Sequence, residues 1–156
     1  MGYVTNNLMP DERVLHVGKI HWFVFVSGTV MLLIAIGLFR ADLEGDMVQV
    51  FGAILFILAM INLINAFIFK ISTELAITSK RVIAKVGFIS RSTIELNHKK
   101  VESFIVDQSI FGRIFGFGTI VVCGTGGGKT PIPNIDNPLE FRRQAMKVAD
   151  EADSQQ

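Results

Sequence analysis

Two long apolar runs dominate the first half of the sequence. Residues 22–39 and 47–69 contain no charged side chain. Each run is close to the length of about 20 residues that an α-helix needs to cross a hydrocarbon core of about 30 Å. The pattern therefore predicts a transmembrane helical hairpin over residues 21–70, with spans at about 22–39 and 47–69.

The distribution of charge around these runs predicts their orientation. The short connection, residues 40–46, carries three carboxylates and one arginine, whereas basic residues gather outside the hairpin, among them Lys19 and Lys70. Because cytoplasmic flanks are enriched in lysine and arginine, both termini are expected in the cytoplasm. The alternative is a soluble protein with two buried core helices. A chain of 156 residues offers only a small shell for about 40 apolar residues.

Residues 1–20 are predicted to be an interfacial N-terminal segment. Val14, Leu15 and Val17 form a short apolar set, and Trp22 is typical of an anchor at the membrane surface. His16 and His21 have no third ligand nearby in the sequence. We therefore expect both histidines to be interfacial side chains and not metal ligands.

After Ile71 the apolar period changes to two, which is typical of strands with one packed and one wetted face. The predicted strands lie near 72–78, 81–86, 89–96, 101–107, 118–123 and 131–135. Short connections predict an antiparallel meander. Pro138 after Asn137 then opens a C-terminal helix with an apolar stripe that should pack on the sheet. This predicts a domain over residues 71–150 and a frayed tail over 151–156.

Residues 109–117 interrupt the alternation with aromatic residues and glycine. We expect a crossing segment there, in which large apolar side chains plug the end of the sheet. The four side chains are Ile110, Phe111, Ile114 and Phe115.

The net charge of +1 hides an uneven distribution. Residues 70–135 carry nine basic and four acidic side chains, a net charge of +5. Such a segment suits a surface near anionic headgroups, and it equally suits an ordinary domain on the positive side of a membrane. The candidate basic residues for contact with lipid or a partner are Lys80, Arg81, Lys85, Arg91, Lys99 and Lys100.

The sequence shows no constellation typical of catalysis or of a bound cofactor or metal. The loop GTGGGKT, residues 124–130, has Cys123 where a phosphate-binding loop needs its first glycine, and Pro131 follows where a helix should begin. His98 has no partner that spacing could assign. Cys123 is expected to be a buried small hydrophobe. We expect no enzyme activity, no cofactor, no metal and no nucleic-acid partner.

Two asparagines in the second run, Asn62 and Asn65, lie one helical turn apart. An amide at this depth should face the other helix, another protomer or water. Interhelical hydrogen bonding is one interpretation, and a polar path through an oligomer is the other.

Several motifs in the second half of the chain recur together in one family. A Leu-Thr-x-x-Arg turn has its counterpart in Ile77, Thr78 and Arg81, with isoleucine in place of leucine, and Gly87 closes the following strand. An Arg-x-x-Gly-x-Gly-Thr segment and an Asn-Pro helix start follow at Arg113, Gly116, Gly118 and Thr119, and at Asn137 and Pro138. Over residues 70–146 the sequence resembles bacterial pleckstrin-homology (PH) domains of type 2, which follow transmembrane helices in small bacterial membrane proteins.

The resemblance implies an α+β membrane protein: a two-helix transmembrane hairpin, then an antiparallel PH-like β-barrel or sandwich capped by the C-terminal helix. A PH fold has seven strands, and the sequence shows six. Related bacterial domains form oligomeric rings. Phosphoinositide binding is not implied, because the first turn holds only Ser79, Lys80 and Arg81.

Two functions remain as hypotheses. The first is a non-enzymatic scaffold module in the bacterial cytoplasmic (inner) membrane, with the PH-like domain and both termini in the cytoplasm. Such a module would contact membrane lipids, self-associate, and dock a protein partner or anionic lipid. The alternative is an oligomeric transport or channel component with a polar path near Asn62 and Asn65.

Overall fold

The computed structural model describes residues 2–41, 46–87 and 92–154, with side chains described up to residue 151. The chain divides into two compact units. Met1–His21 and Ser72–Gln156 form a sheet domain, and Trp22–Ile71 forms a helical hairpin. Arg91, one of the candidate basic residues, lies outside the described residues.

The hairpin consists of two apolar helices. A short 3-10 helix η1 (Trp22–Phe25) continues into α2 (Val26–Arg40), and α3 (Asp46–Ser72) follows. Both helices are long and apolar enough to cross a membrane by length and composition, and only 11% of the most apolar window of each is buried. The core helix of a soluble protein would be mostly buried. In the single chain, the apolar side chains of α2 and α3 point largely outward.

The first sheet of the domain is antiparallel with the order β1-β2-β3-β4. Its strands are β1 (Val14–Gly18), β2 (Glu74–Thr78), β3 (Arg81–Val86) and β4 (Ser92–Asn97). The N-terminal segment, expected to be an amphipathic lead-in outside the domain, is corrected here: β1 pairs with β2, with Gly18 opposite Leu75. β1 is the seventh strand of the expected PH fold, which the sequence alone did not reveal. The reason is that its partner, β2, follows the whole hairpin in the sequence.

The second sheet is antiparallel with the order β5-β6-β7. It consists of β5 (Val101–Asp107), β6 (Phe117–Gly124) and β7 (Lys129–Asp136), and a 3-10 turn η2 (His98–Lys100) joins it to the first sheet. The bounds of β3 and β5 are those predicted, whereas β7 begins two residues earlier than predicted. Cys123 is buried as expected.

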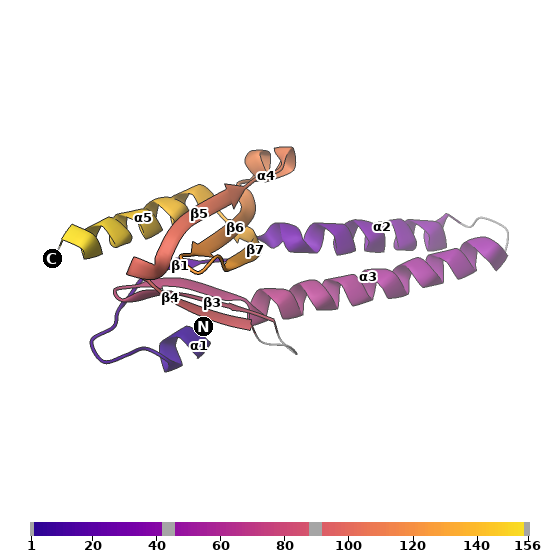
Figure 1. Ribbon diagram of the computed structural model, residues 1–156. Helices are drawn as coiled ribbons and strands as arrows, with labels where there is room; N and C mark the ends of the chain where they lie inside the picture. Colours follow the sequence, from indigo (N-terminus) through magenta and orange to yellow (C-terminus); the bar gives the residue numbers. More distant parts are fainter. Residues whose placement is uncertain (1, 42–45, 88–91, 155–156) are drawn as a thin grey trace. The chain divides into compact units, whose positions relative to one another are not determined.

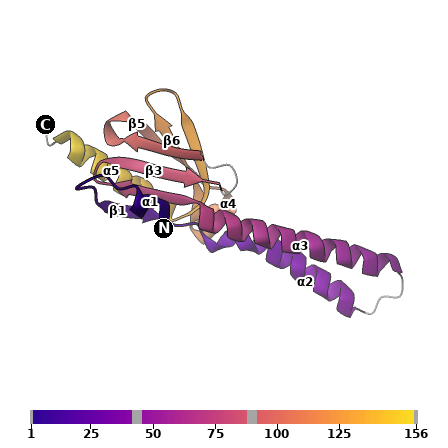
Figure 2. The ribbon, with the colours of Figure 1, turned by 90° about the horizontal axis from the view of Figure 1, so that it is seen from below.

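The C-terminal helix α5 (Pro138–Ser154) begins where the sequence predicts and contacts β1, β5 and β6. Figures 1 and 2 show it running along the two sheets of the domain. Phe141 and Ala145 of the predicted apolar stripe are fully buried. The largest buried side chains of the core are Leu75, Ile77, Ile83, Ile120, Ile132, Ile135 and Phe141. The domain is therefore an α+β fold of two antiparallel sheets and a covering helix.

Two short helices complete the domain. Helix α1 (Gly2–Asn6) packs Val4 against Ala76 and Ile83 of the first sheet. Helix α4 (Ile110–Phe115) connects β5 to β6. The predicted plug is wrong, since the four large apolar side chains of α4 are all exposed. Gly112 is the buried residue of α4, so the backbone of this helix, and not its large side chains, meets the domain.

Candidate functional site

The strand register defines two ends of the sheet domain. The chain leaves the domain after Gly18, at His21, and returns at Ser72, just before β2. Both connections belong to the end where Gly18 pairs with Leu75, which we call the exit end. The opposite end, where Val14 pairs with Thr78, we call the remote end. At about 3.3 Å per residue, β2 separates the two ends by about 15 Å.

Three loops meet at the remote end. Arg13 and Ser79 are joined by two hydrogen bonds, one from the Arg13 amide to Ser79 Oγ (3.1 Å) and one from the Ser79 amide to the Arg13 carbonyl (2.9 Å). His98 Nε2 lies 2.8 Å from the Thr78 carbonyl oxygen, which brings η2 beside this turn. The Thr125 amide donates to the Lys100 carbonyl at 3.0 Å, which adds the β6–β7 hairpin.

Exposed basic side chains gather on these loops and form the remote-end basic cluster. Its members are Arg13, Lys80, Lys99, Lys100 and Lys129. Three of them were predicted as candidates from the sequence. Arg13 and Lys129 were not, because neither is near the others in the sequence. Arg13 reaches the cluster through the pairing of β1 with β2, and Lys129 reaches it through the contact of the β6–β7 hairpin with Lys100.

A hollow of about 410 Å³ adjoins this cluster between β5 and α5. Lys99 and Arg142 supply positive charge, Glu102 and Asp150 supply negative charge, and Met146 is one of the apolar residues. Val101, Phe104, Met146 and Ala149 line the same hollow, so apolar contacts and polar groups occur side by side there, as they do in protein–protein interfaces.

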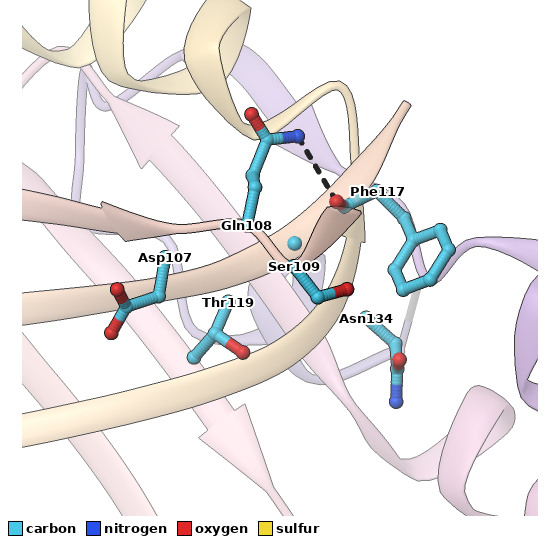
Figure 3. Close-up of a pocket in the computed structure, with 7 residues that line it drawn as sticks. Asp107, Gln108, Ser109, Phe117, Thr119 and Asn134 are labelled. Carbon is cyan, nitrogen blue, oxygen red and sulfur yellow. Dashed lines mark hydrogen bonds between the residues drawn. The ribbon is translucent and has the colours of Figure 1, made fainter. Parts of the chain in front are cut away.

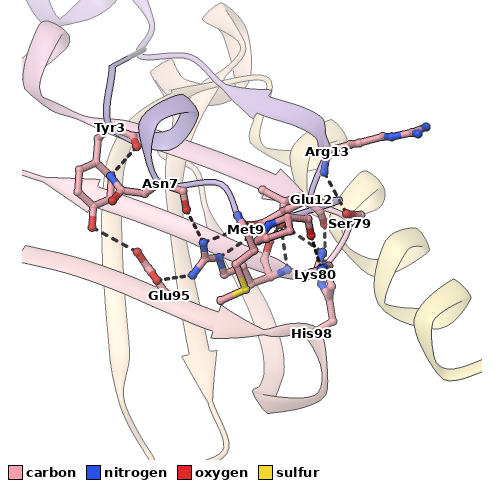
Figure 4. Close-up of polar contacts among 12 residues, drawn as sticks. Tyr3, Asn7, Met9, Glu12, Arg13, Ser79, Lys80, Glu95 and His98 are labelled. Atoms are coloured by element: carbon pink, nitrogen blue, oxygen red, sulfur yellow. Dashed lines mark hydrogen bonds and ion pairs between the residues drawn. The ribbon is translucent and has the colours of Figure 1, made fainter.

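Arg81 differs from the exposed basic candidates Lys80, Lys99 and Lys100 because it is buried and paired with carboxylates (Figure 4). Its Nε lies 3.0 Å from Glu12 Oε1, its Nη1 lies 2.6 Å from Glu95 Oε2, and its Nη2 donates to the Asn7 carbonyl at 2.7 Å. Thr78 Oγ1 accepts the Arg81 amide at 3.0 Å and donates to Glu12 at 2.6 Å. Thr78 and Arg81 of the family motif thus hold the N-terminal segment, and Arg81 does not belong to the exposed basic surface.

Glu12 is the acidic centre of this network. Burial raises the pKa of the Glu12 carboxyl, but hydrogen bonds from the Met9 amide, the Thr78 hydroxyl and the Arg81 guanidinium outweigh burial and lower the pKa below its usual value. Glu12 is therefore an ionised structural group. Only one feature of the sequence indicated this role for Glu12, which is its place just before the apolar residues Val14, Leu15 and Val17.

Lys85 lies at a second internal contact of the N-terminal segment. Its Nζ is 3.9 Å from Glu74 Oε1 and 5.1 Å from the centre of the Tyr3 ring. The Glu74 carboxylate accepts the amides of Tyr3 and Val4 at 3.2 and 3.1 Å. Burial raises the pKa of Glu74, and these amides together with Lys85 more than offset that rise, so the pKa is lowered.

At the exit end, a hollow of about 340 Å³ lies beside Ser109, the N-cap residue of α4, and Figure 3 shows the residues that line it. Asp107 is its acidic residue, Gln108 Nε2 donates to the Phe117 carbonyl at 3.0 Å, and Ser109 Oγ accepts the Gly112 amide at 3.1 Å. Ser109 is thus used to cap a helix. Among the described residues, no group of three or more histidine, cysteine or acidic side chains could hold a metal ion.

The two candidate asparagines of α3 differ in their surroundings. Ser27 Oγ of α2 donates to Asn62 Oδ1 at 3.0 Å, an interhelical hydrogen bond within the hairpin. Gly28 permits this close approach, since a Cβ there would lie 2.8 Å from Leu63. Asn65 is exposed on the single chain.

Comparison with known proteins agrees with this architecture. The model of the bacterial PH domain family matches residues 15–149, and the chain belongs to this family. The match begins within β1, so it includes the hairpin and the strand before it. PH domains of this kind are generally non-catalytic interaction modules.

One solved structure is similar to part of the chain. It is a DUF1696 family protein with a pleckstrin-homology domain from Shewanella loihica PV-4, which is 11% identical. The match covers 49% of this chain and 71% of the other, with a TM-score of 0.38. No curated protein matches the chain.

Proposed function

We propose that the protein is a non-catalytic interaction module that α2 and α3 anchor in the bacterial cytoplasmic membrane, with the PH domain on the cytoplasmic side. The high exposure of apolar side chains on both helices supports the anchor. The observation that carries the proposal is the division of the domain into two ends. Both connections to the apolar helices leave from the exit end, and the remote-end basic cluster lies at the other.

The ligand of the remote-end basic cluster is an acidic surface of a protein partner. Anionic lipid attracts basic residues only within about one Debye length, roughly 8 Å at physiological salt. Within the domain, Lys80 and Lys99 lie about one strand length, roughly 15 Å, from the two connections to the apolar helices. The adjoining hollow between β5 and α5 offers apolar contact beside the charges, which suits a protein more than a lipid headgroup.

Self-association is part of this function. An exposed amide in an apolar helix is costly against lipid, and Asn65 of a second copy can supply the hydrogen-bond partner. The transport alternative requires Asn62 and Asn65 to line a shared polar path. The hydrogen bond from Ser27 to Asn62 within the hairpin favours the structural role.

Reversing the charge of Lys80, Lys99 and Lys100 to glutamate tests the partner site in the full chain. A matched control reverses Lys19, Arg143 and Lys147, which are exposed and lie outside the cluster. Cross-linking in cells should capture a discrete partner with the native chain and the control, and lose it with the first variant. Binding of the native chain to vesicles of anionic lipid, abolished by the same variant, would contradict a protein partner. Extraction of the native chain by alkaline carbonate would contradict the membrane anchor.

A further inference from the structure

Helix α4 displays an apolar surface that the fold of the domain does not use. Ile110, Phe111 and Ile114 are 77%, 64% and 69% exposed and share one face of the helix. Isolated exposed apolar residues are common on proteins, but adjacent large ones usually mark a contact surface. We call these three side chains the α4 face.

The backbone of α4 is held firmly, so the orientation of the α4 face is fixed. Ser109 Oγ caps the helix by accepting the Gly112 amide, and Gly116 ends it in the left-handed conformation at φ 79°. The Gly116 carbonyl accepts the Asn137 amide of the neighbouring segment at 2.8 Å. A Cβ at Gly112 would lie 2.6 Å from the Phe117 carbonyl oxygen. The domain therefore contacts α4 on its Gly112 side, and the side chains of the α4 face point outward.

Contacts within the domain show at which of its two ends α4 lies. Phe117 follows α4 by two residues, and its ring stacks on His21 with 5.4 Å between the ring centroids. The His21 amide also donates to the Asn134 carbonyl at 2.7 Å. The next residue, Trp22, begins the first apolar helix. Helix α4 therefore lies at the exit end of the domain, near His21, the last residue of the domain before the first apolar helix.

We propose that α4 is an interfacial membrane contact whose Ile110, Phe111 and Ile114 insert between the headgroups and acyl chains of the bilayer that α2 and α3 cross. This inference rests on the proposed membrane anchor and adds a contact that orients the domain. The six residues of α4 include no acidic side chain, and exposed Arg113 suits phosphate headgroups. Interfacial helices combine basic and large apolar side chains in this way.

Site-specific labelling of the full chain in liposomes tests this contact. Cys123 is replaced by serine, and a single cysteine carrying an environment-sensitive fluorophore is placed at Ile114, at Lys147 on α5, or at Ile57 on α3. Nitroxides on the lipid chains, near the headgroup or deep in the bilayer, serve as one quencher, and aqueous iodide serves as the other. The Ile114 label should be quenched by the shallow nitroxide and shielded from iodide severalfold better than the Lys147 label.

The Ile57 label separates the two proposals. Quenching of Ile57 by the deep nitroxide, together with iodide access at Ile114 equal to that at Lys147, would overturn the α4 contact and leave the anchor intact. Loss of deep quenching at Ile57 would overturn both. Shielding of Ile114 from iodide without lipid quenching would indicate a protein surface and would also overturn the α4 contact.

A second variant guards against an effect of the label itself. Ile110→Ser, Phe111→Ser and Ile114→Ser are combined, and the fluorophore is moved to Leu139. Leu139 is an exposed residue at the start of α5 that lines one hollow with Arg113 and Gly116 of the α4 segment. The Leu139 label should lose most of its quenching by the shallow nitroxide in this variant. Unchanged quenching would contradict the contact. Because the three side chains are exposed, the thermal unfolding of the domain should stay as in the native chain.

Discussion

Arg81 Nε lies 3.0 Å from Glu12 Oε1, although 69 residues separate the two in the chain. The pair joins the segment before the hairpin to the strands after it, and the Arg81 guanidinium also reaches Glu95 and the Asn7 carbonyl. A module of this family can therefore hold its N-terminal segment in the fold although two long helices intervene. The same contact turns a basic residue that the sequence placed among surface candidates into an internal one.

Replacing Arg81 by methionine should strongly destabilise the sheet domain. The change leaves the buried Glu12 carboxylate without its cationic partner, which typically costs about 3–5 kcal/mol. Buried Cys123 provides the measurement, since a thiol-reactive dye labels it only when the domain opens. Lys99→Met, at an exposed residue outside this network, should change the free energy of unfolding by less than about 0.5 kcal/mol. Equal melting temperatures for the two variants would contradict the role of the network.

The domain should lose stability in acid. The pKa values of Glu12 and Glu74 are lowered in the folded state relative to the ordinary value of 4.5. Their contribution is complete above the unfolded pKa and is lost as the pH falls through the lower folded values. Thermal unfolding followed by circular dichroism across this pH range measures the loss. The double variant Glu12→Gln and Glu74→Gln should be less stable at neutral pH and show a flatter acid dependence, and an unchanged slope would contradict the assignment.

Gly112→Ala should destabilise the domain by about 1–3 kcal/mol, the usual range for overpacking a close contact. The added Cβ meets the Phe117 carbonyl oxygen at 2.6 Å, so α4 has to move away from β6. Gly126→Ala is the matched control, because a Cβ there meets nothing within 4 Å. The melting temperatures of the two variants, measured by Cys123 labelling, give the comparison. A neutral Gly112→Ala would mean that α4 is held less firmly than its contacts indicate.

Asn65→Leu should reduce the mass of the protein in a mild detergent, measured by light scattering with correction for bound detergent. Leucine removes the exposed amide through which a second copy is proposed to bind. Asn62→Leu should leave the mass unchanged, because Asn62 accepts its hydrogen bond from Ser27 inside the hairpin. A monomeric native chain, or a loss of association with Asn62→Leu alone, would contradict this assignment.

The local pattern of the sequence was sufficient to predict most of the helices and strands of this protein. The two uncharged apolar runs predict α2 and α3, the period of two predicts the strands from β2 onward, and Pro138 marks the start of α5. These features depend on side chains that are neighbours along the chain, so periodicity and helix starts are sufficient to find them. The family resemblance added the PH architecture, which the match over residues 15–149 confirms.

Only the tertiary structure decided how distant segments meet. The partner of β1 is β2, beyond the entire hairpin, and no local pattern in residues 14–18 identifies it. Arg81 is internal because Glu12 neutralises it, and α4 faces outward because Gly112 is the residue that fits against Phe117. In each case the free energy of a side chain depends on contacts across long separations in the sequence, which periodicity along one segment does not contain.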